Sequence, residues 1–500
     1  MIELSAYQEQ DFSGLFGSQA EGNDLLKAMQ AGAITGRDTT NQLLTQEPLK
    51  VESLEKTLKL LEFRMKDVKL WNAIPKLTAY NTVEEFIQLE SYGTDRGGFY
   101  GEGELSDVED SKYRRRAELV KYIQVTGEVT LQAQMVRSYV AAMAKEVENK
   151  SMWVIRKVSS ALTKADSTYV SKEFNGIYAQ HASIGSGEGD VYLSLDAYQD
   201  SAAVIDLRGR SLKQADLAKA ATNVDNNFGN VDTLFAPPSV LDGLANDYYE
   251  RQRIMLNGSY QGVIGTVPKG IDTQFGTINL FQDKFMKKTP ARLIGDSATS
   301  PKAPAAPTVT SQTVVGGDAQ SRFKAGEAHT GALGTVFYAV AAINEYGESP
   351  ITVFHNTTKI TLAAGSSVDL VFTATAGAYS PSGYVIYRSE VTAASNATTG
   401  KVLFYPLFKV SAAELAAGYD GGAAGAVRDR NRFLPNTEEG FTVEMVDDVL
   451  SFKQLAPISK LDLAVVAPAN RFITFLWGTP QLYTPKKMVR FINVGPYVAS

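Results

Sequence analysis

The stretch that decides the fold is AQMVRSYVAAMAKEVENKSMWVIRKVSSALTK, at residues 133–164. Its apolar residues recur every three, four or seven positions, which is the spacing of one face of an α-helix. We expect Val140, Met143, Val147 and Val154 to form the buried stripe of this helix. At 1.5 Å per residue, an uninterrupted helix over this stretch would span about 48 Å. That length is typical of a structural strut.

Two strand-like runs precede the helix. Residues 82–90 read TVEEFIQLE and residues 116–130 read RAELVKYIQVTGEVT, and both show the alternation expected of strands. The segment between them is rich in Gly and in acidic residues. The pattern predicts a long β-hairpin with a flexible acidic tip.

Charged residues gather at one arm of this hairpin. A lone two-stranded ribbon is marginally stable in water, so we expect the hairpin to dock on a neighbouring molecule. Complementary charges guide such docking. The candidate inter-subunit contacts are the acidic residues Asp107, Glu109 and Asp110 and the basic triplet Arg114, Arg115 and Arg116. A solvated loop with scattered charges is the alternative, and the residues alone do not decide between the two.

The rest of the chain changes character several times. Residues 1–45 are polar and weakly patterned, which indicates an extended arm, and 50–69 have the pattern of an amphipathic helix. Residues 166–296 are mixed α/β. A Pro/Ala/Ser-rich linker then leads into short strands at 309–434, which predict a β-sandwich, and the last 60 residues return to a mixed pattern. We therefore expect the sandwich to interrupt an α/β domain whose two halves meet in space.

Composition excludes several classes of protein. The chain has 500 residues, 44% hydrophobic and 21% charged, which is enough for several folded domains and excludes disorder throughout. A net charge of −6 argues against a protein that grips nucleic acid tightly. The absence of Cys and the presence of only three His exclude disulfides and thiolate or multi-His metal sites. We expect neither a secretory signal nor a membrane span.

Catalytic motifs are absent from the sequence. GSGEGD at 185–190 lacks the P-loop spacing and does not open a helix, so we interpret it as a loop. Ser186 and Ser239 lack the nucleophile-elbow spacing, and Asp447 with Asp448 has no partner ligands nearby in the sequence. We therefore predict no catalytic, cofactor-binding or metal-binding residues, and favour a structural or binding protein over an enzyme.

The order of these elements resembles the HK97-fold major capsid proteins of tailed bacteriophages. FITFLWGTPQLYTPKKMVRFINV at 472–494 resembles the C-terminus of major capsid proteins from large contractile-tailed phages. DTLFAPPSVLDGLAND at 232–247 resembles a strand and helix of their A-domain. YAVAAINEYGESP at 338–350 and GYVIYRS at 383–389 resemble segments of fibronectin type III or Ig-like modules.

The resemblance implies an α+β, HK97-like capsid fold with an inserted all-β, Ig-like sandwich. Its parts would be the N-terminal arm with an amphipathic helix (1–70), the E-loop hairpin (71–130), the spine helix of the P-domain (131–165), the A-domain/P-domain (166–298), the inserted Ig/fibronectin type III-like domain (299–436) and the return to the A/P-domain (437–500).

The same resemblance implies a function. Copies of the chain would assemble as hexamers and pentamers into the icosahedral head of a tailed bacteriophage and enclose double-stranded DNA. The implied partners are other copies, scaffold, portal and decoration proteins, and packaged DNA in non-specific contact, with no membrane and no cofactor. The protein would reside in the virion capsid, and in the bacterial host cytoplasm during assembly.

One departure and two alternatives accompany the resemblance. Some shells of this fold crosslink an E-loop Lys to an Asn near the C-terminus. Here the tip at 93–110 has no Lys, although Asn493 is in place, so the resemblance does not extend to a covalent crosslink. The alternatives are a fibronectin type III-containing phage tail or adhesion protein and an encapsulin-like compartment shell. The strut helix and hairpin disfavour the first, and the long arm and the insertion disfavour the second.

Overall fold

The computed structural model describes residues 62–496 except 94–97, 106–107, 136–141, 183–193, 253–269, 289, 326–332, 393, 395 and 465–467, and it gives the backbone alone at 90 and 248–252. Residues from Phe63 onwards form one compact unit. The predictions made for the arm at 1–61, for the Gly-rich segment 185–190, for Asp107 and for Val140 lie outside the described residues.

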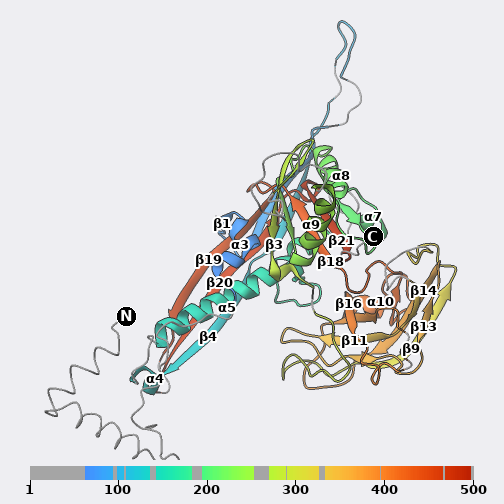
Figure 1. The fold of residues 1–500 in the computed structure, drawn as a ribbon. Coiled ribbons are helices and arrows are strands. Elements are labelled where there is room, and N and C mark those ends of the chain that lie inside the picture. Colours follow the sequence, from blue (N-terminus) through green and yellow to red (C-terminus); the bar gives the residue numbers. More distant parts are fainter. Residues whose placement is uncertain are drawn as a thin grey trace, which may run out of the picture. The chain divides into compact units, whose positions relative to one another are not determined.

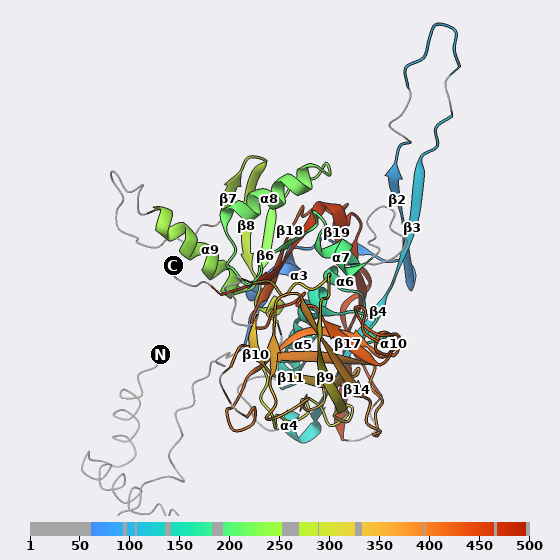
Figure 2. The ribbon, with the colours of Figure 1, turned by 90° about the vertical axis from the view of Figure 1, so that its right-hand side faces the viewer.

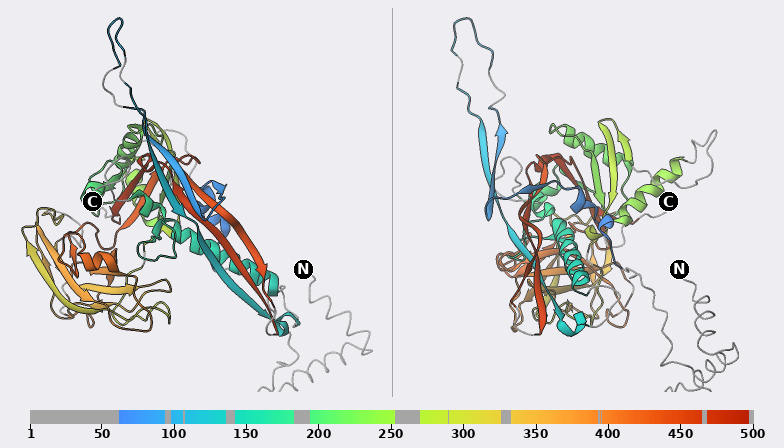
Figure 3. Two further views of the ribbon diagram at one scale, coloured as in Figure 1. Left: turned by 180° about the vertical axis from the view of Figure 1, so that it is seen from behind. Right: turned by 90° about the vertical axis from the view of Figure 1, so that its left-hand side faces the viewer.

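A long four-stranded sheet is built from two segments that lie far apart in the sequence. Its strands run in the order β1 (Lys76–Thr78), β19 (Leu450–Asp462), β20 (Ala469–Leu482) and β4 (Lys121–Thr130). β19 and β20 form an antiparallel pair, and β4 pairs with β20 along its whole length. Helix α5 (Ala142–Lys164) lies along this sheet (Figures 1 and 3). The predicted strut therefore has a long sheet to pack on.

Helix α5 is buried over its C-terminal half only. Val154 is fully enclosed, as are Val158 and Leu162, in a core shared with strands of the long sheet. Met143 and Val147 are half-buried. All the enclosed side chains of α5 lie between 154 and 163. The apolar stripe predicted from the sequence therefore packs against the long sheet only from Val154 onwards. Of the helix predicted at 133–164, the described parts are α4 (Leu131–Met135) and α5, and the residues between them lie outside the described ranges.

The boundaries of two other predicted elements are wrong. The hairpin arm predicted at 116–130 is divided at buried Val120, because its second half leaves the hairpin to pair with β20. The helix predicted at 50–69 does not reach its expected end: Arg64 is extended, and only η1 (Met65–Asp67) and α3 (Lys69–Ala73) follow. Trp71 in α3 packs edge-on against Phe452 of β19, with ring centroids 4.8 Å apart, and so ties this segment to the long sheet.

The second sheet joins the two halves of the α/β region. Its six strands run in the order β5, β21, β18, β6, β8 and β7, at Val204–Asp206, Met488–Val494, Glu438–Val443, Thr233–Ala236, Gly276–Gln282 and Gly270–Thr273. β18 and β21 come after the inserted segment, and β18 pairs directly with β6, which comes before it. The prediction that the two halves meet in space is confirmed.

Several helices accompany this sheet. The two longest, α8 (Gln214–Asp225) and α9 (Pro238–Gln252), pack on its strands (Figure 2). The shorter ones are α6 (Ile177–His181), α7 (Leu195–Gln199), η2 (Lys284–Met286) and η3 (Pro485–Lys487). Of these, η2 contacts α5, and α6 contacts both α5 and β20. The helices therefore tie the two sheets into one body.

The inserted segment contains the expected series of short strands. One sheet has the order β12, β11, β15, β16, at Thr352–Val353, Tyr338–Ile343, Gly383–Ser389 and Phe404–Ser411. The other has the order β17, β14, β9, at Ala426–Asp429, Ser366–Thr373 and Thr308–Gly316, and β10 (Gly334–Val336) pairs with β13 (Ile360–Leu362). Side chains from both sheets, including Ile386 and Leu370, share one core. A short helix that was not expected, α10 (Ala412–Ala417), follows β16.

A buried polar network links α6, α7 and β21. The His181 Nδ1 atom accepts a hydrogen bond from the Tyr198 hydroxyl at 2.8 Å, and Nε2 donates to the Met488 carbonyl at 3.2 Å. The guanidinium of Arg490 donates to the same Tyr198 hydroxyl at 3.3 Å. Burial, reinforced by the charge of Arg490, lowers the pKa of His181 to about 4. His181 is therefore a neutral structural residue at physiological pH.

The network predicts an acid-sensitive fold. In the unfolded chain His181 binds a proton near its ordinary pKa of 6.5, whereas in the folded chain it resists protonation down to about pH 4. Stability should therefore fall as the pH drops from 6.5 to 4, by up to about 3 kcal/mol from this residue. Thermal unfolding of the wild type and of His181→Gln across this range measures the effect. The variant should show a shallower pH dependence, and equal slopes would contradict the assignment.

Candidate assembly surface

A two-stranded ribbon projects from the long sheet. β2 (Val83–Ser91) pairs antiparallel with β3 (Lys112–Leu119), and the pair forms a sheet of its own (Figure 2). One side of the ribbon rests on the body of the molecule. There the Phe86 ring meets Tyr483 edge-on at 4.9 Å, and the Gln88 amide donates a hydrogen bond to the Tyr483 carbonyl. This docking fixes the root of the hairpin and leaves its other side open.

The open side of the ribbon is largely apolar. It presents Val83, Ile87 and Leu89 from β2 and Tyr113 and Leu119 from β3, all exposed, and we call these five residues the ribbon face. Ile87 is 71% exposed and Tyr113 is 69% exposed. In the strand register, Val83 lies opposite Leu119 and Leu89 opposite Tyr113, so the apolar side chains are neighbours. Exposed apolar side chains gathered on one side are a feature of interaction sites, and here Glu85 and Arg115 lie among them.

The Arg triplet is divided between the two sides of the ribbon. Successive side chains of a strand point to opposite faces. Arg114 and Arg116 therefore lie on the docked side and are half-buried, whereas Arg115 lies on the open side and forms an ion pair with Glu85. Glu109 and Asp110 are exposed in the segment before β3. The structure thus does not present the three arginines as one basic surface.

A titratable carboxyl group sits on the docked side of the ribbon. Glu118 in β3 accepts a hydrogen bond from the Asn175 amide at 3.2 Å. Burial raises the pKa of Glu118 to about 7, against the opposing effect of this hydrogen bond. The ionised form of Glu118 is therefore disfavoured in the folded protein. Sequence patterning gave no sign of this residue, because its burial depends on a distant loop.

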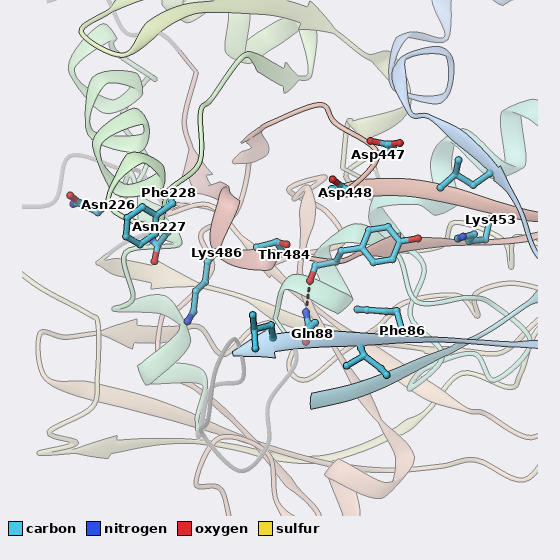
Figure 4. A pocket seen from close by; sticks show the side chains of 14 residues that line it. Phe86, Gln88, Asn226, Asn227, Phe228, Asp447, Asp448, Lys453, Thr484 and Lys486 are labelled. Atoms are coloured by element: carbon cyan, nitrogen blue, oxygen red, sulfur yellow. Dashed lines mark hydrogen bonds between the residues drawn. The ribbon is translucent and has the colours of Figure 1, made fainter. Parts of the chain in front are cut away.

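A cleft of about 790 Å³ opens between the ribbon, the long sheet and neighbouring loops (Figure 4). Phe86, Ile87, Gln88 and Leu89 of β2 form one wall. The opposite side is polar and comes from loops, with lining residues Asn226, Asn227, Asp447, Asp448, Thr484 and Lys486 among them. Asp447 and Asp448, predicted to be surface charges, are exposed at its rim. The cleft therefore adjoins the ribbon face.

Phe228 is the most exposed aromatic side chain in this region. It lines the cleft from the loop after α8 and is 95% exposed. Its backbone is left-handed, with φ +58°, which is unfavourable for a bulky residue. A strained backbone that presents a phenyl ring to solvent is a feature of contact sites. No sequence pattern singled out Phe228.

Asn493 is not available as the asparagine partner of a covalent crosslink, although its position near the C-terminus would allow that role. Its side chain is fully buried. The amide oxygen accepts from the Leu434 backbone N–H at 2.9 Å, and the amide nitrogen donates to Asp206 and to the Arg432 carbonyl, both at 2.9 Å. Asn493 is therefore occupied within its own chain and is inaccessible to a crosslinking lysine.

Within the described ranges, neither a membrane-spanning helix nor a cluster of metal-ligating side chains is present. None of the helices there has the length and apolar character needed to cross a bilayer. Nor does any group of three or more His, Asp or Glu side chains in those ranges have the arrangement of a metal site. What this part of the molecule does offer is exposed apolar surface on a ribbon and an adjoining cleft.

Comparison with known proteins gives a family match and several relatives. Residues 34–328, more than half of the chain, match the family model described as SU10 major capsid protein. The major capsid proteins of Staphylococcus phage S25-3 and Staphylococcus phage K are each 23% identical over 477 residues, covering 94% of this chain and 95% of theirs.

Solved structures also resemble the chain at low sequence identity. The capsid protein of cyanophage P-SCSP1u is 9% identical, with a TM-score of 0.44, and the match covers 92% of this chain and 99% of that one. The SrpI encapsulin of Synechococcus elongatus is 7% identical, with a TM-score of 0.39, covering 89% of this chain and 95% of that one.

Proposed function

The chain belongs to the SU10 major capsid protein family, and from this we propose that its copies assemble as hexamers and pentamers into the icosahedral head of a tailed bacteriophage. It is a structural protein of the virion capsid and not an enzyme. The family match over residues 34–328 is the observation that carries this conclusion. It also favours a capsid protein over a tail or adhesion protein, the first alternative raised by the sequence.

The fold is assigned as HK97-like on the order of its parts. The ribbon β2–β3 corresponds to the E-loop, α5 with the long sheet to the P-domain, and the six-stranded sheet to the A-domain. Residues 299–436 are the inserted Ig/fibronectin type III-like domain, and 437–500 return to the A/P-domain. The facing sheets β12-β11-β15-β16 and β17-β14-β9 support the insertion.

The ribbon face is the inter-subunit contact in this proposal. Its apolar side chains gain stability when a second copy covers them, at roughly 25 cal/mol per Å² of apolar surface buried. Exposed Glu109 and Asp110 lie beside this face in the segment before β3, and the ion-paired Arg115 lies within it opposite Ile87; such charges guide orientation more than they add affinity. Val154 and the half-buried Met143 and Val147 give the spine helix the rigidity that an assembling subunit needs.

Other partners follow from the capsid role. The head would enclose packaged double-stranded DNA, and assembly in the host cytoplasm would use scaffold and portal proteins, with decoration proteins added to the finished shell. An acidic chain suits a container, because confinement does not require tight binding to phosphates throughout.

Electron microscopy of the purified chain tests this function. We expect closed shells with fivefold and sixfold clusters of subunits in negative stain. Particles recovered from infected cells should also protect double-stranded DNA from nuclease, which separates a phage head from an encapsulin-like compartment. Fibres or isolated trimers with knob-like ends would instead indicate a tail or adhesion protein and would contradict the proposal.

The inserted domain should fold alone. Its two cores are built from residues within 299–436, with Tyr169 and Ile294 packed against one of them, and its buried ion pair, Arg388 with Asp429 at 2.8 Å, lies wholly within it. The contacts to the rest of the chain include ion pairs, such as Arg432 with Asp196 at 2.5 Å and Arg322 with Asp200 at 2.8 Å, and a backbone bridge between Arg292 and Phe404. Excised residues 299–436 should therefore give a β-type circular dichroism spectrum and a cooperative thermal transition. A spectrum of a disordered chain would count against an independent domain.

A further inference from the structure

A basic groove runs along the exposed side of α5. Its volume is about 470 Å³, and it is lined by Trp153, Arg156, Lys157, Ser160 and Lys164 of α5 and by Lys284 and Phe285 of η2. The α5 residues are spaced by one, three and four positions, so they share one face of the helix. That face is distinct from the enclosed one that carries Val154, Val158 and Leu162.

The groove concentrates positive charge on an acidic protein. Four of its lining side chains are cationic, and among the described residues none that lines it is a carboxylate. Lys157 lies 3.4 Å from Glu173 and is half exposed, so this pair leaves its ammonium accessible. The whole chain carries a net charge of −6. A local cluster of cations against that background is a specific electrostatic feature of this surface.

Lys164 adds a second observation. Lys164 is half-buried at the end of the groove, where its ammonium group donates a hydrogen bond to the Lys287 carbonyl. Burial lowers the pKa of Lys164 to about 8, although the charges of Glu438, Asp283 and Glu439 oppose this shift. An anion in the groove would stabilise the charged form of Lys164.

We propose that this groove binds the phosphate backbone of packaged double-stranded DNA. From Arg156 to Lys164 the helix advances by about 12 Å. Double-stranded DNA carries one negative charge per ~1.7 Å of axis, so several phosphates fall within this distance. The proposal rests on the proposed function, since it assigns the capsid's contact with its contents to named residues. It follows that this side of α5 faces the interior of the shell.

The chemistry of the groove favours DNA over an acidic protein segment. Lys and Arg side chains only donate hydrogen bonds, and phosphate oxygens only accept them. A peptide would also need acceptors for its backbone N–H groups, and of the lining side chains only the Ser160 hydroxyl accepts. The contacts would be independent of base sequence, as contacts to phosphates are.

Binding of a short fluorescein-labelled DNA duplex to the unassembled full-length chain tests this proposal. Anisotropy is measured at several salt concentrations for the wild type and for the double variant Arg156→Gln, Lys284→Gln, in which both altered side chains are exposed. We expect the groove variant to bind the duplex at least about tenfold more weakly than the wild type does. The slope of the logarithm of its association constant against the logarithm of the salt concentration should be smaller in magnitude by about 2. The matched control is Lys219→Gln, Lys324→Gln, which removes two exposed charges elsewhere and should bind as the wild type does.

Unchanged affinity and an unchanged salt slope in the groove variant would overturn the proposal. A poly-glutamate peptide that binds through the groove, with DNA binding unaffected, would also overturn it and would assign the groove to an acidic protein segment. The same preparations are examined for shells by electron microscopy. Wild-type protein that fails to form shells refutes the proposed function, whereas shells with groove-independent DNA binding refute only this inference.

Discussion

Replacing Ile87 by Asp should leave the subunit folded and prevent it from assembling. Ile87 lies at the middle of the ribbon face and is 71% exposed, so the substitution removes no packing within the chain. Exposed positions of this kind change the free energy of unfolding by less than about 0.5 kcal/mol. In an assembled shell, however, the carboxylate would be buried against a second copy beside Arg115, whose guanidinium is already paired with Glu85, so the cost of removing it from water at every contact would be only partly offset. Sedimentation should show at least a tenfold loss of shells.

The control for this experiment is Val314→Asp. Val314 is also an exposed apolar residue on a strand, 42% exposed in β9, but it lies in the inserted domain and outside the ribbon face. It should assemble normally. Normal shells from Ile87→Asp, with a melting temperature equal to that of the wild type, would show that the ribbon face is not an assembly contact.

The sequence predicted the features that depend on local periodicity. The strut helix was visible because its apolar residues recur at helical spacing, and the strands of the inserted segment were visible because turn residues separate them. The meeting of the two α/β halves followed from a change of composition on either side of the insertion, and β18 pairing with β6 confirms it. These are properties of short windows, in which side-chain pattern and secondary structure agree.

Features that depend on distant pairing were not predictable in this way. The division of the second hairpin arm at Val120 arises because β4 pairs with β20, some 350 residues later in the chain. Asn493 has the residue type expected for a crosslink, yet three hydrogen bonds to distant residues occupy its side chain. Phe228 is exposed because a left-handed backbone turns it outwards, and no single-residue pattern encodes that conformation.

In the ribbon, charged residues that are adjacent in the sequence lie on opposite sides of the strand. Counted along the sequence, Arg114, Arg115 and Arg116 form a basic cluster opposite an acidic tip. In the strand, alternation sends Arg115 to the open side and the other two to the docked side. The same alternation places Val83, Ile87 and Leu89 together on the open side. The better candidate for contact is thus the apolar set on the open side, to which the sequence pattern alone assigned no role.

The largest effect on the folded subunit is expected from Val154→Asp. Val154 is fully buried in the core between α5 and the long sheet, where a carboxylate would have neither water nor a cationic partner provided by the fold. Such burial costs several kcal/mol or forces the group to stay protonated, and either outcome is a large fraction of the stability of a domain. We expect aggregated protein, or a melting temperature lowered by more than about 10 °C.

Val147→Asp and Glu148→Gln complete the series along the same helix. Val147 is half-buried, so its Asp variant should destabilise the monomer less than Val154→Asp does. It should still impair assembly, because it makes the helix less rigid. Glu148 is exposed and pairs with Lys145 at 2.9 Å, a surface contact worth under about 0.5 kcal/mol, so its Gln variant should behave as the wild type. Denaturant unfolding of the three variants should therefore rank their stabilities as Glu148→Gln, Val147→Asp, Val154→Asp, from highest to lowest. Equal stabilities would mean that α5 does not pack on the long sheet through the face that carries Val154, and the helix would lose its role as the rigid spine of the subunit.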